Sequence, residues 1–303
     1  MRLSIVQPQY PQQYPIKRWA RMEGAFQRRK EKVVVIMGAT GSGKSRLSID
    51  LASLFPNSEI INSDKMQVYR GLDITTNKIP QAQRRGVPHH LLGDVDPGQG
   101  ELSPGEFRRR AGQLIWEMRK RGSLPLVVGG SNSFVHAALV EKLEGNVNVF
   151  DSPTPISSEL RYCCCFLWVD IAFPVLSQHL RQRVDEMLDS GMVDELAEFF
   201  HSSPTPFPLR KAIGVPEFHR FFNQYPPSHP LRDPAYVEAV RAIKDNTCHL
   251  ARRQIHKIHR LRLSGWDLRR IDATQAFLSG SHDVWLTQVL EPSVKIVKRF
   301  LME

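Results

Sequence analysis

The chain has 303 residues, of which 41% are hydrophobic and 24% charged, and this composition is typical of a globular protein with one large domain or one domain plus a smaller one. No apolar run approaches the roughly 20 residues that a membrane-spanning helix needs, so we expect no membrane partner. The net charge of +10 favours anionic partners such as nucleotides, diphosphates or nucleic acid, although a basic surface kept for solubility is the simpler alternative.

The first 32 residues differ in composition from the rest of the chain. They contain eight Lys or Arg and only two acids, Glu23 and Glu31, and they lack the apolar core of a secretory signal. A basic, acid-poor leader is typical of an organelle transit peptide, but this one is poor in Ser, so an ordinary disordered arm is an equal alternative. We predict a basic flexible arm over 1–32.

A phosphate-binding loop follows the arm. The apolar run at 33–37 predicts a buried parallel strand, and 46–54 has the spacing of a helix. Between them the chain reads Gly38, Ala39, Thr40, Gly41, Ser42, Gly43, Lys44 and Ser45. Such a loop wraps its backbone amides round an anion, while the lysine reaches phosphate oxygens and the following hydroxyl can bind Mg²⁺. The loop predicts a polyphosphate ligand and leaves open which one binds.

Strands and helices continue to alternate after this loop. Residues 59–64 read as a second strand and 124–128 as a third, each ending in polar residues. Between them, 66–100 reads as a polar connection and 104–121 as a helix with a capping box at its start. A further helix is predicted at 133–140.

The second half of the chain adds one strand before it turns mainly helical. Residues 160–171 predict the fourth strand, followed by helices at 174–188 and 193–200. A Pro-rich segment covers 201–234 and contains the basic pair Arg210-Lys211. Residues 235–263 lack Pro and Gly and predict a long basic helix, whose charges are either a binding surface or a solvated face. A short strand at 268–271 and a helix at 284–290 complete the chain.

This alternation predicts an α/β fold, with a P-loop NTPase-like parallel sheet flanked by helices and a smaller helical subdomain. We assign 33–200 together with 235–303 to the catalytic core. We assign 201–234 to a Pro-rich connection between its two parts.

Several polar residues are expected to meet where the parallel strands end, because ligands of open parallel sheets bind at the carboxyl ends of the strands. Asp64 ends the second strand and can act as a general base or a metal ligand, or simply form a local turn. Ser131 and Asn132 follow the third strand, and Asp170 ends the fourth. Arg161, at the start of the fourth strand, has a planar fork suited to polyphosphate oxygens.

Four sequence blocks carry a family resemblance: 38–45, 61–69 (Ile-Asn-Ser-Asp-Lys-Met-Gln-Val-Tyr), 127–133 (Val-Val-Gly-Gly-Ser-Asn-Ser) and 210–214 (Arg-Lys-Ala-Ile-Gly). Together they resemble the isopentenyltransferases, which include tRNA dimethylallyltransferases and the plant adenylate isopentenyltransferases of cytokinin synthesis. Segments 164–170 and 251–258 are most similar to the plant adenylate enzymes. The resemblance extends over about 32–272.

The resemblance implies that a dimethylallyl group moves from dimethylallyl diphosphate to N6 of AMP, ADP or ATP, with Mg²⁺ held at Ser45. Asp64 would accept the N6 proton, while Thr40, Lys44 and Arg161 would stabilise the leaving diphosphate. The substrate-binding residues implied are Gly38, Ala39, Thr40, Gly41, Ser42, Gly43, Lys44, Ser45, Ser63, Gly130, Ser131, Asn132 and Asp170, with Lys211, Lys244 and Arg252 for the acceptor's phosphates. We expect a monomer located in the plastid, with the cytoplasm as the alternative.

Two other functions compete with this interpretation. A tRNA dimethylallyltransferase shares the catalytic core, and the long basic helix would be its RNA surface. However, 141–200 is shorter than in most tRNA enzymes, and no Cys/His pairing follows Asp272. A small-molecule kinase or an NTP-driven switch would also fit the loop alone. The only Asn-Lys pair, Asn77-Lys78, precedes Ile-Pro and does not match the guanine-binding Asn-Lys-x-Asp motif.

Overall fold

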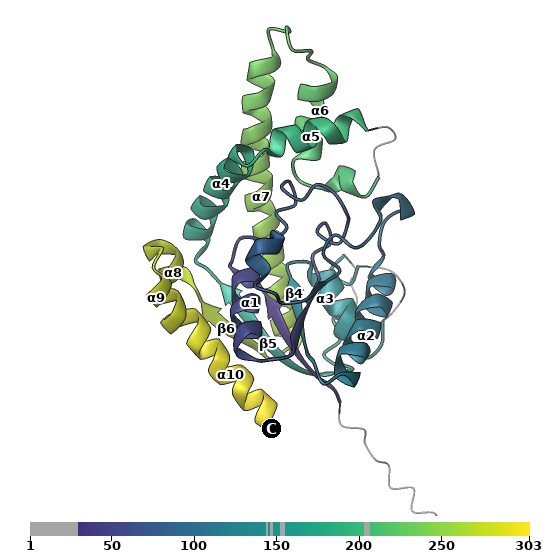
Figure 1. Cartoon of the computed structure of the whole chain (residues 1–303), viewed down its shortest axis with the longest axis vertical. Coiled ribbons are helices and arrows are strands. Elements are labelled where there is room, and N and C mark those ends of the chain that lie inside the picture. The colour runs from purple at the N-terminus through teal and green to yellow at the C-terminus, as the bar shows by residue number, and fades with distance from the viewer. Residues whose placement is uncertain (1–29, 144, 146–147, 152–154, 203–206) are drawn as a thin grey trace, which may run out of the picture.

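The computed structural model describes residues 30–303, except 144, 146–147, 152–154 and 203–206. Nearly all of the arm predicted over 1–32 therefore lies outside the described residues. Within the described part of the chain, no helix is both long and apolar enough to cross a membrane. A helix-flanked sheet forms the body of the molecule, and a group of helices projects from it (Figure 1).

The sheet has six strands, all paired in parallel, in the order β3-β2-β4-β1-β5-β6. They are β1 (Lys32–Met37), β2 (Ser58–Asn62), β3 (His89–His90), β4 (Leu124–Gly129), β5 (Cys163–Asp170) and β6 (Leu268–Asp272). The predicted strands are all present, and the expected α/β class is confirmed. The two-residue strand β3 was not predicted, because a segment this short has no periodicity to recognise.

The helices are α1 (Lys44–Leu54), α2 (Pro104–Lys120), α3 (Asn132–Leu139), α4 (Phe173–Asp189), α5 (Met192–His201), α6 (Val215–Asn223), α7 (Arg232–Leu263), α8 (Thr274–Ser279), α9 (His282–Trp285) and α10 (Glu291–Met302). Short 3₁₀ turns lie at η1 (Gln81–Arg84), η2 (Pro97–Gln99) and η3 (Leu209–Lys211), and a π-helical turn, η4 (Leu286–Leu290), joins α9 to α10. The predicted helix at 284–290 is therefore only the middle of a longer helical stretch.

Two hydrophobic cores cover the two faces of the sheet, which explains why β1 is apolar at every position after Lys32. Val33 and Val35 pack with α2, α3 and the C-terminal half of α7. Val34 and Ile36 point to the other face and pack with α1 and α8 to α10. The central strands are thus buried on both sides, and they hold the loops at their carboxyl ends in fixed positions.

The helical extension is built from α5, α6, η3 and the N-terminal part of α7 (Figure 1). Its centre is aromatic: the ring of Phe218 lies 5.6 Å from that of Phe221 and 5.8 Å from that of Tyr236. Part of the Pro-rich segment at 201–234 folds here as η3 and α6. Helix α7 then runs from this extension back to the sheet, so one continuous helix links the two parts.

A buried carboxylate in β2 joins the sheet edge to α2. Glu59 accepts hydrogen bonds from Arg121 Nε at 2.8 Å and from Arg121 Nη2 at 2.6 Å, and it also contacts His90. The Arg121 hydrogen bonds lower the pKa of Glu59 to about 2, against its ordinary 4.5. This interaction therefore stabilises the fold above about pH 4.5, and its contribution disappears as the pH falls toward 2.

We predict that Arg121→Ala lowers the free energy of unfolding at neutral pH, because the buried carboxylate of Glu59 loses a charged hydrogen-bond donor. Denaturant titration at pH 7 and at pH 3 measures the effect. Arg119→Ala, which removes the same charge from the same helix end, is the control and should change stability by less than about 0.5 kcal/mol. Equal losses in the two variants would contradict the prediction.

Candidate functional site

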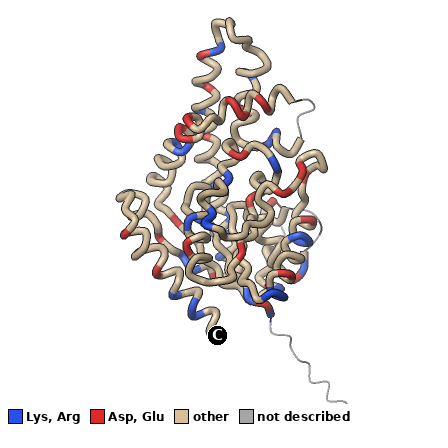
Figure 2. The backbone as a smooth tube through the Cα atoms, viewed as in Figure 1, with Lys and Arg blue, Asp and Glu red and all other residues tan. Residues whose placement is uncertain are grey.

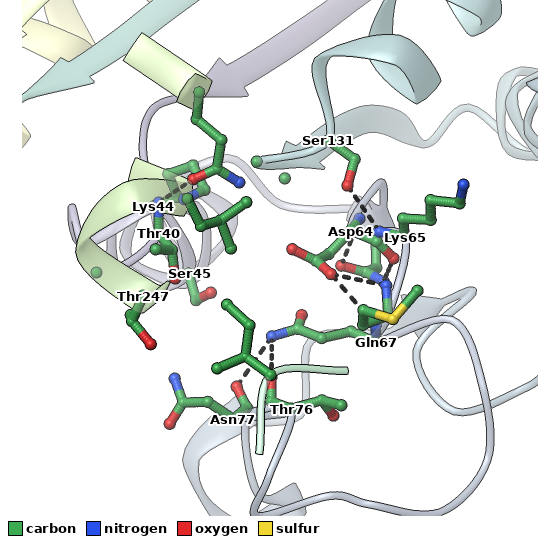
Figure 3. Close-up of a pocket in the computed structure, with 18 of the residues that line it drawn as sticks. Thr40, Lys44, Ser45, Asp64, Lys65, Gln67, Thr76, Asn77, Ser131 and Thr247 are labelled. Carbon is green, nitrogen blue, oxygen red and sulfur yellow. Dashed lines mark hydrogen bonds between the residues drawn. The ribbon is translucent and has the colours of Figure 1, made fainter. Parts of the chain in front are cut away.

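A cavity of about 780 Å³ opens at the carboxyl edge of the sheet. It is bordered by the phosphate loop before α1, by the loops after β2 and β4, and by α4, α7 and η3 (Figure 3). The volume falls in the range of small-molecule sites and can accommodate a nucleotide beside a short prenyl diphosphate. Of the polar residues predicted for this edge, Asp64, Ser131 and Asn132 line it.

The phosphate loop forms one wall. Gly43 precedes α1 with φ of +88°, and a Cβ at this position would lie 2.8 Å from Cη2 of Trp285, so only glycine fits. Lys44 Nζ donates a hydrogen bond to the carbonyl of Ala39 at 2.6 Å. Burial lowers the pKa of Lys44 to about 8, and the charge of Asp64 opposes this shift. An anion bound in the loop would raise this pKa again and keep the amine protonated to higher pH.

The loop also has a suitable ligand for Mg²⁺. Ser45 lines the cavity at the start of α1, next to Lys44 (Figure 3). Mg²⁺ accepts a single protein hydroxyl when diphosphate oxygens and water complete its octahedral shell. Within the loop, the buried Ser42 Oγ has no protein partner and is available to a bound anion. The residues present therefore fit a magnesium diphosphate.

Asp64 lies across the cavity from the phosphate loop (Figure 3). Its Oδ1 accepts hydrogen bonds from the backbone N–H groups of Met66 at 2.9 Å and Gln67 at 3.3 Å. Its own backbone N–H donates to Asn62 Oδ1 at 3.3 Å, and Asn62 is in turn fixed to the carbonyl of Leu91. These contacts hold the carboxylate in one orientation at the end of β2, as a positioned general base requires.

Ser63, just before Asp64, is fully buried and faces the end of β4. A Cβ on Gly129 would lie 2.4 Å from Ser63 Oγ, so the glycine permits the close approach of the two strand ends. Ser63 does not line the cavity. Its position supports the turn that presents Asp64.

Arg183 is a site residue that sequence reasoning missed. It lies on α4, and its Nη2 donates a hydrogen bond to Thr40 Oγ1 at 2.9 Å. Its Nε is buried and has no protein partner, and burial lowers the pKa of the guanidinium while the nearby Asp64 opposes the shift. One signal was present in the sequence: position 183 borders the apolar stripe of Leu176, Leu180 and Val184, where a charged residue is unusual.

Gln254 on α7 is the second missed residue, and it joins two walls of the cavity. Its Oε1 accepts a hydrogen bond from the backbone N–H of Thr40 at 2.7 Å, and its backbone carbonyl accepts one from Asn132 Nδ2 at 3.0 Å. A Cβ on Gly130 would lie 2.6 Å from Gln254 Nε2. On the opposite wall, Ser131 Oγ accepts from the backbone N–H of Lys65 at 2.8 Å.

The prediction for Arg161 is wrong. Arg161 precedes β5, and the strand begins beside Lys32 at the amino edge of the sheet, opposite to the cavity. Its guanidinium donates to the hydroxyl of Tyr162 and lies over the Tyr162 ring. It does not line the cavity. Parallel strands gather their amino ends at one edge and their carboxyl ends at the other, so a residue that opens a strand cannot reach a ligand at the far edge.

Six further candidates also lie outside the cavity lining, namely Gly38, Ala39 and Ser42 of the phosphate loop and, elsewhere, Asp170, Lys244 and Arg252. Asp170 accepts a hydrogen bond from Arg270 Nε at 2.7 Å, Lys244 pairs with Asp185 at 2.5 Å, and Arg252 stacks on the ring of Phe173. Figure 2 shows that acidic and basic positions are interspersed along the chain. The charges of α7 around Lys244 are thus partly neutralised by neighbouring elements.

Lys211, in contrast, lines the cavity as expected, and other lysines accompany it. Lys65 comes from the loop after β2 and Lys257 from α7, while Lys211 belongs to η3. Elements other than the phosphate loop therefore add positive charge of their own to the cavity. Such a second basic wall suits the phosphates of a second substrate.

Comparison with known proteins agrees with this geometry. The IPP transferase family model matches residues 67–152 and 142–260. An adenylate isopentenyltransferase of Humulus lupulus is 57% identical, over 88% of this chain and 90% of that protein. Adenylate isopentenyltransferase 1, chloroplastic, of Arabidopsis thaliana is 52% identical, over 95% and 87% of the two chains.

The fold has close structural counterparts. A solved eukaryotic dimethylallyltransferase that acts on tRNA superimposes with a TM-score of 0.73 at 26% identity, covering 90% of this chain and 80% of that one. The tRNA isopentenylpyrophosphate transferase of Bacillus halodurans gives the same TM-score at 23% identity, over 90% and 99% of the chains, and shows the fold alone. The expected resemblance and enzyme class are confirmed, and the chain belongs to the IPP transferase family.

Proposed function

We propose that the chain transfers a dimethylallyl group from dimethylallyl diphosphate to N6 of AMP, ADP or ATP and releases diphosphate, as the first step of cytokinin biosynthesis. One observation carries the proposal: the fixed carboxylate of Asp64 faces the buried cations Lys44 and Arg183 across a single cavity. A diphosphate leaving group and an N–H nucleophile need opposite kinds of residues on opposite sides of the reacting carbon.

The phosphate loop and Arg183 act on the leaving group. As the bond between C1 of the prenyl chain and the diphosphate oxygen breaks, negative charge grows on that oxygen. Lys44 and Arg183 stabilise this charge, and Arg183 also donates a hydrogen bond that holds the Thr40 hydroxyl. Mg²⁺ at Ser45 would add positive charge to the diphosphate when bound.

Asp64 acts on the nucleophile. The N6 lone pair of adenine is delocalised into the ring, so the amine attacks C1 only as it loses a proton. The carboxylate accepts that proton while the C1–N6 bond forms. Because the turn at Met66 and Gln67 fixes Oδ1, the base is oriented before the acceptor arrives.

We assign the acceptor's phosphates to the wall that carries Lys65, Lys211 and Lys257. The tRNA alternative has support from the structural counterpart that acts on tRNA. Against it, the high-identity relatives over most of the chain are adenylate enzymes. We further propose a monomer in the plastid, since several Arabidopsis relatives are named chloroplastic, although one is named mitochondrial.

The lowered pKa of Lys44 predicts how donor binding responds to pH. Below about pH 8 the amine is protonated before and after binding, so its contribution to affinity is constant. Above about pH 8 the free protein must take up a proton to bind the diphosphate, and affinity falls. We expect calorimetry with dimethylallyl diphosphate and Mg²⁺ to show proton uptake growing from pH 7.5 to 9, which is about the range over which Lys44 titrates. Proton uptake that is unchanged in Lys44→Met would contradict this assignment.

A product assay tests the proposed function. The chain is incubated with dimethylallyl diphosphate, Mg²⁺ and, in parallel, AMP, ADP, ATP or unmodified tRNA, and products are read by mass. A gain of one prenyl group on free nucleotides supports the proposal and ranks the acceptors. Modification of tRNA alone would overturn it in favour of the tRNA enzyme. ATP turnover without a prenyl donor would instead indicate a kinase.

A further inference from the structure

Two of the lysines that line the cavity share one carboxylate. Glu101 Oε1 lies 2.6 Å from Lys65 Nζ, and Glu101 Oε2 lies 2.5 Å from Lys211 Nζ. The hydrogen bonds from Lys211 and Lys65 lower the pKa of Glu101, so the group is anionic at neutral pH. The two lysines come from distant parts of the chain, the loop after β2 and the 3₁₀ turn η3, and Glu101 bridges them with one oxygen each.

A phosphate group bound between the same two lysines would take the place of this carboxylate. A carboxylate and a phosphate both offer oxygens to ammonium donors, and the phosphate carries more charge. The carboxylate is anchored through its own backbone, because the next residue, Leu102, is buried and donates its N–H to the hydroxyl of Tyr69 at 2.7 Å. The lysine side chains are flexible at their ends, so they can change partner while Glu101 stays.

The three groups are accessible enough to exchange. The exposed fractions of the side chains are 37% for Lys65, 47% for Lys211 and 30% for Glu101. Ion pairs at this exposure are worth little individually, and water can replace either partner. Glu101 itself does not line the cavity, whereas both lysines do. A polyphosphate in the cavity therefore meets the two lysines at the cavity wall, where Glu101 itself is not exposed.

We propose that Glu101 is an internal competitor for the acceptor's phosphates, which holds Lys65 and Lys211 together in the free enzyme and yields them to the nucleotide. The inference rests on the proposed function, because it assigns this wall to the acceptor. The acceptor must break the ion pairs between Glu101 and the two lysines before its phosphates can bind there, and this lowers its affinity. An acceptor with more phosphates interacts more strongly with the two lysines. Competition from Glu101 therefore lowers the affinity for ATP and ADP more than the affinity for AMP.

The variant Glu101→Gln tests this competition. We expect the KM for ADP and ATP to fall about three- to tenfold, the KM for AMP to fall less, and the KM for adenosine to stay unchanged. The kcat and the KM for dimethylallyl diphosphate should not change. The gain in affinity should shrink at high salt, because the lysines are partly exposed. Direct calorimetry with ADP in the absence of the prenyl donor should give the same fold-change in affinity.

Two further variants make the test specific. Glu117→Gln removes the same charge from the last turn of α2, where Glu117 contacts Gln113, and should leave every KM unchanged. In a Lys211→Met background, Glu101→Gln should gain markedly less affinity for ADP than in the wild type. An equal effect on adenosine and ATP, no effect on ADP, or a lower kcat alone would overturn the proposal and assign Glu101 to fold stability. If the wild type prenylates no nucleotide, the proposed function fails, while ADP calorimetry still tests the competition.

Discussion

Asp64→Asn is expected to lower kcat by about 10²- to 10⁴-fold, with little change in the affinity for dimethylallyl diphosphate. The amide keeps an oxygen for the N–H groups of Met66 and Gln67, so the turn after β2 is retained. What it loses is the ability to accept the proton from N6. Single-turnover product formation with prenyl donor and nucleotide measures the effect, and calorimetry with the donor checks binding.

Asp64→Ala separates the two tasks of the carboxylate. It removes the base and the turn contacts together, so it should be as inactive as Asp64→Asn but less stable. Turnover in Asp64→Asn within tenfold of the wild type would remove Asp64 from the role of base. In that case a water-mediated proton path from N6 would be required.

Arg183→Met should be the second severe variant, with kcat lowered by about 10²- to 10³-fold. Its guanidinium donates a hydrogen bond to Thr40 and is buried, which lowers its pKa while the charge of Asp64 opposes the shift, so we expect it to stabilise the leaving diphosphate. Arg183→Lys should recover only part of the rate, because an ammonium cannot reproduce the planar fork. The measurement is kcat at saturating donor and acceptor, with folding checked by circular dichroism.

Arg161→Met is the matched control for this prediction. Arg161 has the same chemistry as Arg183 and lies at the amino edge of the sheet, on Tyr162. We expect its kcat to stay within about twofold of the wild type, since it has no route to the reacting atoms. A large loss of kcat in Arg161→Met, with Arg183→Met near normal, would reverse the assignment of the two arginines.

Local signals in the sequence identified the phosphate loop and the strand ends. Glycines at 38, 41 and 43, an apolar strand before them and a helix after them are enough to define a loop whose geometry is set by its own backbone. Asp64 could be placed because it ends a strand, and parallel strands bring their ends together. Both predictions follow from the local sequence and do not depend on which distant helices pack against the sheet.

The site residues that were missed owe their position to the packing of elements that are distant in sequence. Arg183 and Gln254 reach Thr40 from α4 and α7, more than 140 positions away in sequence. Nothing local to either helix predicts which turn faces the loop. Arg161 failed for a different reason: β5 has eight residues, which separates its two ends by about 25 Å, and the expected strand started at the wrong edge for a ligand contact.

Helix α7 sets a mechanical limit on the site. It has 32 residues, a length of about 48 Å, and a single stripe of it, at 243, 247, 250, 254 and 257, lines the cavity from the helical extension down to the phosphate loop. A continuous helix moves as one rigid body. Any displacement of the extension is therefore transmitted to Gln254 and to the loop amide that it holds, so the two halves of the cavity cannot adjust to their substrates independently.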